Sequence, residues 1–563
     1  MRAITFHLTL LLLFSLPASA QSGNPPAAAI ASAHPLATRA GLEVLQKGGN
    51  AFDAAVAITA ALAVVEPMGS GLGGGGFWLL HRARDGFETM VDGRERAPLA
   101  AFRDMYLDQE GNPVPRISLN GPLAAAIPGT PAALDHITRN YGRLSLKQNL
   151  APAIRLARQG FPVYERYRRM VSFRFKPITA SPAAANAFLK NGLVPDVGHT
   201  LIQTDLARTL NRIARKGRKG FYDGPLARSL VKGVRAAGGI WTEKDLKQYR
   251  VVERTPITGS FRGLKYTSAA LPSSGGIVLK QTLNILHAFP LARLSGSERK
   301  HLIIESMRRA HRDRARYLGD GDFINVDINK LTGRNYATFL RNSITHAATP
   351  SAKLGKSKYR PKGRDTTHFS VIDQQGNRVA ATLSINYPFG SAFVPPGTGV
   401  VLNNEMDDFS VKPGVANAYG LVGNEANAIA PGKRPLSSMS PTFLESKDKV
   451  VVLGTPGGSR IISMVLLVML EVSEDRGGPA DWVALKRFHH QYLPDVVQYE
   501  AGALTDKEIR NLVRRGHKLE RRKRPYGNMH VVVWDKKNNK VLAASDPRGE
   551  GLALSEAVVE RIK

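Results

Sequence analysis

The chain has 563 residues, more than one small hydrophobic core can serve, so its length predicts two to four domains or one large layered fold. Cysteine is absent, which excludes disulfides, thiolate metal sites and lipid-anchored cysteines, while 43% hydrophobic residues are typical of a globular protein. The net charge of +32 comes from dispersed basic residues without a nucleic-acid-binding motif, so we interpret it as a solvated surface and expect no nucleic-acid partner.

Residues 1–20 have the pattern of an export signal. Arg2 provides the positive start, an apolar run follows from Ile4 to Leu16, and Ala18-Ser19-Ala20 offers a cleavage site of small residues. The apolar run is too short to span a bilayer, and no later run is of that kind. We therefore expect a periplasmic or secreted protein without a membrane anchor.

Two helices and a glycine-rich loop are predicted next. An amphipathic helix over Pro35 to Lys47 ends at Gly48-Gly49, and a helix that is apolar on nearly every side follows from Ala51 to Val65. The loop Gly69 to Gly76 contains the spacing G-x-G-x-x-G, but it leaves a helix and enters the strand Phe77 to His81. A dinucleotide-binding loop runs in the opposite order, so close packing of the backbone explains these glycines better.

A hairpin turning at Asp85-Gly86 leads into the run Asp92 to Pro98, which contains Arg94. An arginine after a strand is most often an exposed charge. Residues 117–345 are predicted to be mostly helical, and their histidines have no metal-ligand spacing, so we expect no metal site. Residues 349–365 have the Pro, Gly, Ser and Lys content of a linker, which we expect to be exposed and mobile.

The stretch from Asp365 to Ile385 is predicted to be a β-hairpin. Thr367 to Ile372 alternates polar and apolar residues, Val379 to Ile385 is rich in β-branched and small residues, and a Gly-Asn turn separates them. If the turn centres on Gln375, the numbers of paired residues sum to 750, which places Thr366 opposite Ser384. Because side chains alternate in a strand, Thr382, Ser384 and Asn386 share one face.

Another junction is suited to binding a developing negative charge. A buried strand over Val450 to Leu453 meets Gly457-Gly458, and the apolar helix Ile461 to Leu470 follows. Backbone N–H groups at such a strand–Gly-Gly–helix junction are free to donate to an oxyanion.

Four runs in this order resemble the γ-glutamyltransferases (γ-glutamyltranspeptidases). They are Thr366-Thr367-His368-Phe369-Ser370-Val371, Leu402 to Ser410, Arg434 to Pro441, and Gly457 to Arg460. The resemblance implies an α+β fold, a four-layer αββα sandwich of the N-terminal-nucleophile hydrolase type. It also implies one precursor that cleaves itself between Asp365 and Thr366, giving a heterodimer of a large subunit (21–365) and a small subunit (366–563).

The resemblance also implies the roles of the site residues, and it implies that the reaction needs no cofactor. Thr366 is the nucleophile, and its own α-amine, with a pKa of about 7.7–8.0, is the base. The remaining roles are oxyanion donors (Gly457, Gly458), a hydroxyl beside the nucleophile (Ser384), α-carboxylate ligands (Arg94, Ser437, Ser438), ammonium ligands (Asn386, Glu405, Asp408) and the inner contact of a lid loop, 413–420 (Tyr419).

The expected activity is cleavage of glutathione and other γ-glutamyl compounds, with transfer to water or to amino-acid or peptide acceptors. The sequence departs from the family pattern at three places. These are Ser384, where the family commonly has threonine, the pair Tyr387-Pro388, and the run Gly527 to His530. Two alternatives are an acylase for glutaryl side chains of β-lactams on the same scaffold and an inactive, basic envelope protein that binds anionic polymers. Glu405 and Asp408 argue against the acylase, because a glutaryl group has no ammonium to bind.

Overall fold

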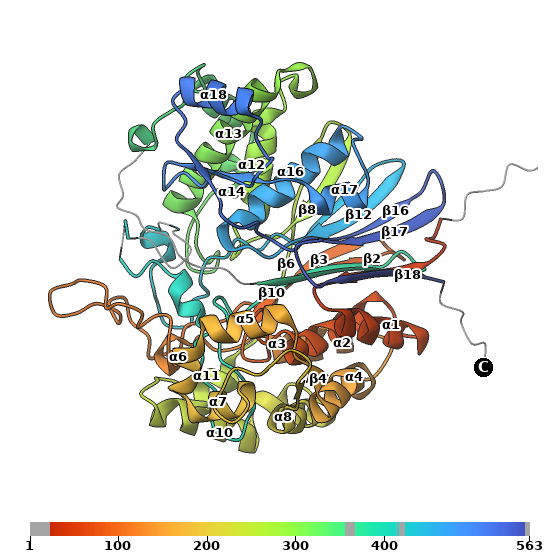
Figure 1. The fold of residues 1–563 in the computed structure, drawn as a ribbon, viewed down its shortest axis with the longest axis vertical. Helices are drawn as coiled ribbons and strands as arrows, with labels where there is room; N and C mark the ends of the chain where they lie inside the picture. The colour runs from red at the N-terminus through yellow and green to blue at the C-terminus, as the bar shows by residue number, and fades with distance from the viewer. Residues whose placement is uncertain (1–22, 355–365, 413, 416–420, 422, 558–563) are drawn as a thin grey trace, which may run out of the picture.

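The computed structural model describes residues 23–354, 366–412, 414–415, 421 and 423–557. Two β-sheets lie face to face between two layers of helices (Figure 1). The expected αββα sandwich is therefore confirmed. Within the described ranges, no helix has the length and apolar character required to cross a membrane. The export signal at 1–20 lies outside these ranges.

The two large sheets are antiparallel throughout. The first contains, in spatial order, β18 (Leu552–Glu556), β1 (Ala28–Ser32), β9 (Thr367–Ile372), β10 (Arg378–Ser384), β2 (Gly75–Arg82), β3 (Phe87–Asp92) and β6 (Val252–Arg254). The second contains β17 (Lys540–Ser545), β16 (His530–Asp535), β12 (Lys449–Gly454), β11 (Thr442–Glu445), β8 (Leu264–Ser268) and β7 (Ile257–Phe261). A small three-stranded sheet contains β13 (Phe488–His489), β14 (Val497–Tyr499) and β15 (Leu519–Arg521). A two-stranded sheet pairs β4 (Phe161–Pro162) with β5 (Thr200–Leu201).

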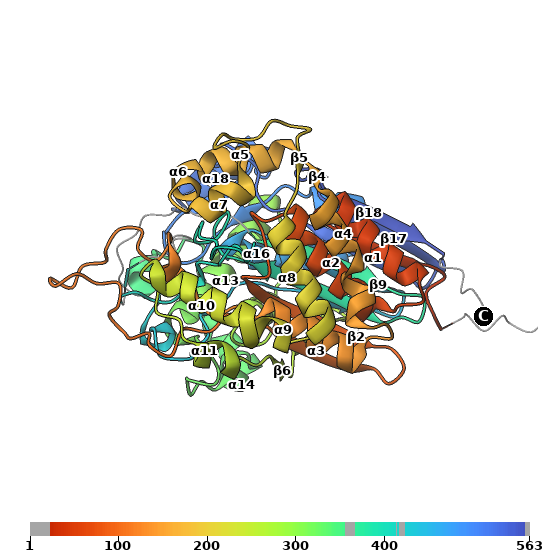
Figure 2. The same cartoon turned by 90° about the horizontal axis from the view of Figure 1, so that it is seen from below.

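One helical layer covers the first sheet and the other covers the second (Figures 1 and 2). The first layer comprises α1 (Pro35–Gln46), α2 (Ala51–Val65), α3 (Thr130–Tyr141), α4 (Leu146–Gln159), α5 (Glu165–Phe173), α6 (Phe175–Thr179), α7 (Pro182–Phe188), α8 (Thr204–Lys216), α9 (Lys219–Tyr222), α10 (Gly224–Ala236) and α11 (Glu243–Gln248). The second comprises α12 (Gly275–Leu286), α13 (Gly296–Tyr317), α14 (Ile328–Leu331), α15 (Arg334–Asn342), α16 (Ile461–Ser473), α17 (Pro479–Ala484) and α18 (Asp506–Arg514).

The hydrophobic cores follow from the period-two pattern of the central strands. On β9 and β10, Val371 and Val379 face the core beneath the first helical layer, whereas Ile372 and Ala380 face the core shared with the second sheet. α2 is buried along its whole length, as its continuous apolar sequence predicts. The first sheet is thus buried on both faces, and it holds its central strands rigidly in place.

The predicted hairpin register is confirmed. Arg378 pairs with Ile372 and Leu383 pairs with Thr367, so each pair of numbers sums to 750. The glycine-rich loop also packs as predicted, because a Cβ on Gly73 would lie 2.0 Å from the carbonyl oxygen of Val401. A residue with a side chain at position 73 would therefore prevent the loop from approaching the neighbouring backbone this closely.

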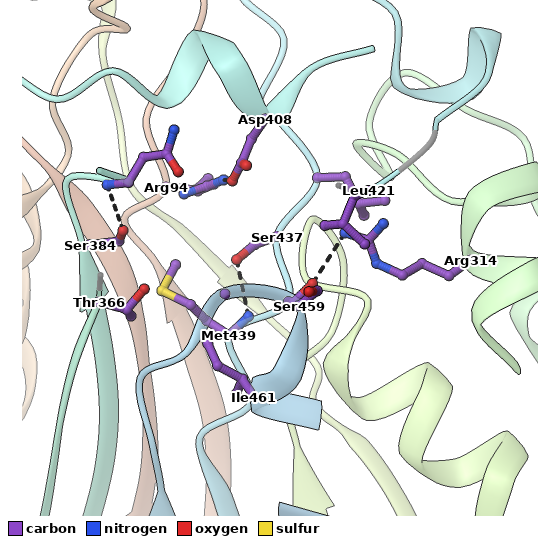
Figure 3. Close-up of a pocket in the computed structure, with 14 residues that line it drawn as sticks. Arg94, Arg314, Thr366, Ser384, Asp408, Leu421, Ser437, Met439, Ser459 and Ile461 are labelled. Atoms are coloured by element: carbon purple, nitrogen blue, oxygen red, sulfur yellow. Dashed lines mark hydrogen bonds and ion pairs between the residues drawn. The ribbon is translucent and has the colours of Figure 1, made fainter. Parts of the chain in front are cut away.

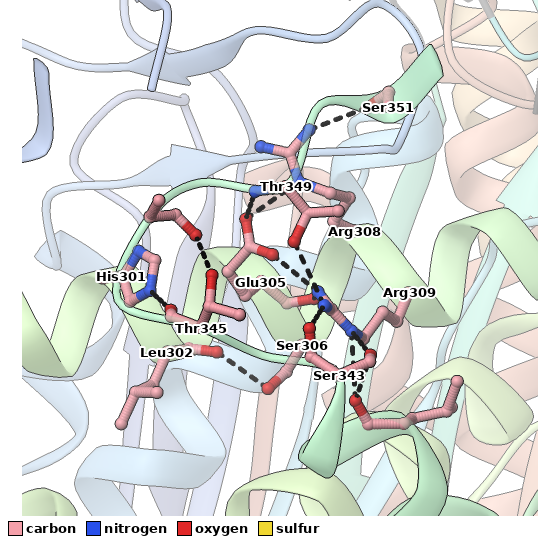
Figure 4. Close-up of polar contacts among 12 residues, drawn as sticks. His301, Leu302, Glu305, Ser306, Arg308, Arg309, Ser343, Thr345, Thr349 and Ser351 are labelled. Carbon is pink, nitrogen blue, oxygen red and sulfur yellow. Dashed lines mark hydrogen bonds and ion pairs between the residues drawn. The ribbon is translucent and has the colours of Figure 1, made fainter. Parts of the chain in front are cut away.

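The expectation of an exposed linker from residue 349 holds for Pro350, Ala352 and Lys353 but is wrong for Ser351 (Figure 4). Ser351 is fully buried; its Oγ accepts from Arg308 Nη1 at 2.7 Å and donates to the carbonyl oxygen of Tyr492 at 2.6 Å. The backbone N–H of Thr349 donates to Glu305 Oε1 at 3.2 Å. Buried polar partners on α13 therefore anchor this segment, which its composition could not indicate. The rest of the linker, 355–365, lies outside the described residues.

Candidate active site

Thr366 lies directly before β9 and is 4% exposed. It lines a cavity at the ends of the central strands, with Ser384 beside it on β10 (Figure 3). The cavity is also lined by residues from both sides of the expected cleavage site, namely Arg94, Arg314, Asn386, Asp408, Leu421, Leu436, Ser437, Ser438, Met439, Gly458, Ser459 and Ile461. The hairpin thus presents the expected nucleophile to a cavity in which most of the lining residues are polar.

The turn after β10 positions Ser384 and Asn386. Ser384 Oγ accepts a hydrogen bond from the Asn386 backbone N–H at 2.7 Å, and Asn386 adopts a φ of 72°. Asn386 Nδ2 donates to the carbonyl oxygen of Asn404 at 2.9 Å. Asparagine tolerates this left-handed conformation better than most residues, so the local backbone favours its presence at the cavity wall.

Arg94 follows β3 and is 1% exposed, so it is not the surface charge that such a position most often carries. Its Nη1 lies 2.6 Å from Glu405 Oε2, and its Nη2 lies 2.6 Å from Asp408 Oδ2. Its Nε donates to the carbonyl oxygen of Pro435 at 3.1 Å. Arg94 therefore holds together the two acids expected to bind an ammonium group.

A third carboxylate, Glu95, lies behind this cluster with its Oε2 3.4 Å from Arg94 Nη1. Burial raises the pKa of Glu95 to about 7, although Arg94 opposes the rise. Burial also raises the pKa of Glu405 well above its ordinary value. Arg94 opposes this rise, whereas the negative charges of Glu95 and Asp408 add to it. Burial alone would lower the pKa of Arg94, but the surrounding acids raise it overall. Arg94 is thus permanently charged, and each of its two Nη groups contacts an acid.

We predict that Glu95→Gln changes the pH dependence of stability. The folded-state pKa of Glu95 lies above its ordinary 4.5, so its contribution to the free energy of unfolding is fully present below pH 4.5 and is lost as the pH rises through about 7. Urea unfolding of cleaved wild type and variant should show the variant gaining relative stability between about pH 5 and 8. A difference that stays constant across this range would contradict a raised pKa.

Ser437 and Ser438 are both prepared to donate into the cavity. Ser437 Oγ accepts from the Met439 backbone N–H at 3.1 Å (Figure 3). Ser438 Oγ accepts from Arg314 Nη2 at 3.2 Å. A hydroxyl that accepts from a protein donor keeps its own proton for another acceptor. Both serines are therefore suited to a carboxylate.

Gly458 lines the cavity, whereas Gly457 is not among its lining residues. Gly457 has a φ of 144° and Gly458 a φ of 60°, and the turn they form precedes a short 3₁₀ segment, Gly458–Arg460, and α16. Both values lie where residues other than glycine are strained. A substitution here would therefore also move the backbone N–H groups proposed as oxyanion donors.

Most of the residues predicted for the site thus converge on one cavity. Glu405 lies behind it, fully buried and in contact with Arg94. Asp365 and Tyr419 lie outside the described residues. Sequence reasoning missed Arg314 on α13, because nothing local distinguishes it from the neighbouring arginines. Within the described part of the chain, no group of three or more metal-ligating side chains is placed to hold a metal ion.

A family model for γ-glutamyltranspeptidase matches residues 37–555. The chain belongs to the γ-glutamyltranspeptidase family. It is 40% identical to a glutathione hydrolase proenzyme of Pseudomonas sp. (strain A14), covering 96% of this chain and 95% of that one. It is also 40% identical to the glutathione hydrolase proenzyme of Escherichia coli (strain K12), covering 92% and 90%.

Solved structures agree with this membership of the γ-glutamyltranspeptidase family. The crystal structure of the γ-glutamyltranspeptidase of Helicobacter pylori is 41% identical, with a TM-score of 0.56 over 57% of this chain and 93% of that chain. A cephalosporin acylase of Bacillus halodurans is 27% identical, with a TM-score of 0.82 over 97% and 99%. The scaffold is therefore shared with an acylase, so the distinction between the two activities depends on the cavity.

Proposed function

We propose that this chain is a γ-glutamyltransferase and glutathione hydrolase whose nucleophile is Thr366. The observation that carries the proposal is the position of Thr366 at the start of β9, in one cavity with a buried arginine–carboxylate cluster and two serine hydroxyls. Such a cavity offers ligands for both charges of an amino-acid head group. We also propose that the enzyme acts in the periplasm or outside the cell, where its export signal would direct it.

Self-cleavage is the first reaction. Thr366 Oγ attacks the carbonyl carbon of residue 365, the C–N bond breaks, and the peptide becomes an ester with a free α-amine on Thr366. Water then hydrolyses the ester, which leaves a carboxylate on residue 365 and restores the hydroxyl. The reaction divides the precursor into a heterodimer of large and small subunits.

Turnover uses the groups that cleavage releases. Thr366 Oγ attacks the γ-glutamyl carbonyl while its α-amine takes the hydroxyl proton and delivers it to the departing amine. Backbone N–H groups at Gly457 and Gly458 would stabilise the oxyanion. The γ-glutamyl ester is resolved by water, releasing glutamate, or by the amine of an amino-acid or peptide acceptor.

The glutaryl acylase is the second candidate, favoured by the similarity to the cephalosporin acylase structure. Purified, cleaved enzyme should be assayed with γ-glutamyl and glutaryl p-nitroanilides, which differ only in the ammonium group. Because Asp408 lines the cavity and would bind that group through a charge-assisted hydrogen bond, we expect kcat/KM for the γ-glutamyl compound to be higher by about 10-fold to more than 100-fold. Equal or reversed values would favour the acylase.

A further inference from the structure

A second cavity within the described part of the chain has a volume of about 390 Å³ and shares no lining residue with the cavity of Thr366. It is lined by four basic side chains and one acid, with an alanine and a proline, namely Lys486, Arg521, Arg522, Lys523, Glu500, Ala501 and Pro525. A cavity of this volume accommodates a small molecule rather than a single ion. Basic residues are dispersed over most of the sequence, but here four of them surround one cavity.

The pairing of two strands brings these basic residues together. β14 and β15 are parallel, with Tyr499 opposite Arg521, so the residues that follow the two strands lie at the same edge of the small sheet. The backbone N–H of Arg522 donates to the carbonyl oxygen of Tyr499 at 2.8 Å, which fixes the basic run against β14. Lys486 reaches the same cavity from the segment between α17 and β13. The cations are therefore held together by the fold and not only by their positions in the sequence.

Glu500, the acid of this cavity, does not neutralise the four cations. It is 3% exposed, its Oε2 lies 2.8 Å from Arg548 Nη2, and its Oε1 accepts from the Tyr526 backbone N–H at 2.9 Å. Arg548 also contacts Asp546, which forms an ion pair with Arg487. These two acids and two arginines balance one another, so the charge of the lining cations is not compensated by Glu500.

Of the four cations, only Arg522 has an ion pair with an acid within the described ranges. Its Nη1 lies 2.8 Å from Oε1 of Glu520, an exposed side chain. Its Nε is buried and has no hydrogen-bond partner among the described residues. Like charges that share one cavity repel one another, and a bound anion would relieve that repulsion.

We propose that this cavity is a binding site for a ligand that carries several phosphate groups. The planar fork of an arginine matches the oxygens of a phosphate, and a lysine adds a point charge, so both residue types of the cavity suit this chemistry. Several phosphates are needed to balance four cations. A soluble polyphosphate and a phosphate-bearing lipid headgroup share this chemistry. The proposal goes beyond the hydrolysis of γ-glutamyl compounds, which we assign to a different cavity.

Isothermal titration calorimetry of the purified full-length protein with sodium tripolyphosphate tests the proposal. Wild type should show saturable binding, and the double variant Arg521→Gln/Lys523→Gln should weaken it by about tenfold or more, the effect expected when charge-assisted hydrogen bonds are lost. Both side chains are exposed, so the variant should fold. Its kcat/KM for γ-glutamyl p-nitroanilide should stay within about twofold of wild type, which checks the fold independently.

Arg510→Gln/Arg514→Gln is the matched control. Both arginines are exposed on α18 and lie outside the cavity lining, and the net charge changes by the same amount. This variant should bind tripolyphosphate like wild type. Equal weakening in the two double variants would mean a diffuse attraction to the positive surface and would overturn the proposal. Wild type without saturable binding, or a cavity variant with unchanged binding, would also overturn it.

Co-sedimentation with vesicles of equimolar phosphatidylglycerol and phosphatidylcholine distinguishes the two sources of phosphate. If the ligand is a lipid headgroup, less of the cavity variant than of the control variant should sediment with the vesicles. If the ligand is soluble, the two variants should sediment equally, while the cavity variant still loses its affinity for tripolyphosphate. Failure of this proposal leaves the role of Thr366 intact, which Thr366→Ala tests separately.

Discussion

Purified Thr366→Ala should remain a single chain and show no γ-glutamyl transfer, whereas wild type divides without added protease into fragments of 345 and 198 residues. Alanine lacks the hydroxyl that attacks the preceding carbonyl, so neither the ester nor the free α-amine can form. Thr366→Ser should cleave, more slowly, because the hydroxyl survives. Denaturing electrophoresis over time, together with a γ-glutamyl p-nitroanilide assay, measures both steps.

Two further variants separate the nucleophile from its surroundings. Ser384→Ala should slow both cleavage and turnover, because its hydroxyl lies beside Thr366 in the cavity. Thr367→Ser is the matched control, since Thr367 lies on the opposite face of β9 and donates to Glu66 Oε2 at 2.5 Å. It should cleave and turn over like wild type. Activity in uncut Thr366→Ala would exclude Thr366 as the nucleophile.

Arg94→Lys should lower kcat/KM for γ-glutamyl donors by about 10-fold to more than 100-fold while self-cleavage proceeds. Lysine keeps the charge but has one nitrogen in place of a planar fork. It cannot reach Glu405 and Asp408 together while also donating to Pro435, as Arg94 does. Glu405, which is buried, and Asp408, which is partly exposed, would then lose the arrangement that binds an ammonium group.

Steady-state kinetics of the cleaved variant against wild type measure this loss. Arg96→Lys is the control, since Arg96 donates through Nε to the carbonyl oxygen of Gly432 at 2.8 Å and is not among the cavity residues. We expect it to keep kcat/KM within about twofold of wild type. A similarly small effect of Arg94→Lys would remove Arg94 from the binding site.

Local patterns in the sequence predicted the parts of the fold that depend on short-range regularity. The alternation along β9 and β10, with Gly376 between them, was sufficient to give the correct pairing, and the continuous apolar run of α2 indicated its burial. The four family-like runs then indicated the order of the site residues. Each of these signals lies within a few residues of the feature it predicts.

The remaining features depend on pairing between distant segments. Arg314 and Ser438 are 124 positions apart, and Arg94 and Asp408 are 314 positions apart, so no periodicity indicates that they touch. The anchoring of Ser351 by Arg308 and Tyr492 was missed for the same reason, because composition alone described the segment as a linker. Whether a charged side chain is buried can be determined only from the folded structure, in which distant segments pack against it.

The most direct test of the central claim is N-terminal sequencing of the small fragment released when purified wild-type precursor cleaves itself. We predict that the sequence begins Thr-Thr-His-Phe-Ser, with Thr366 as the first residue. A fragment that begins at any other position would contradict both the proposed cleavage and the identity of the nucleophile.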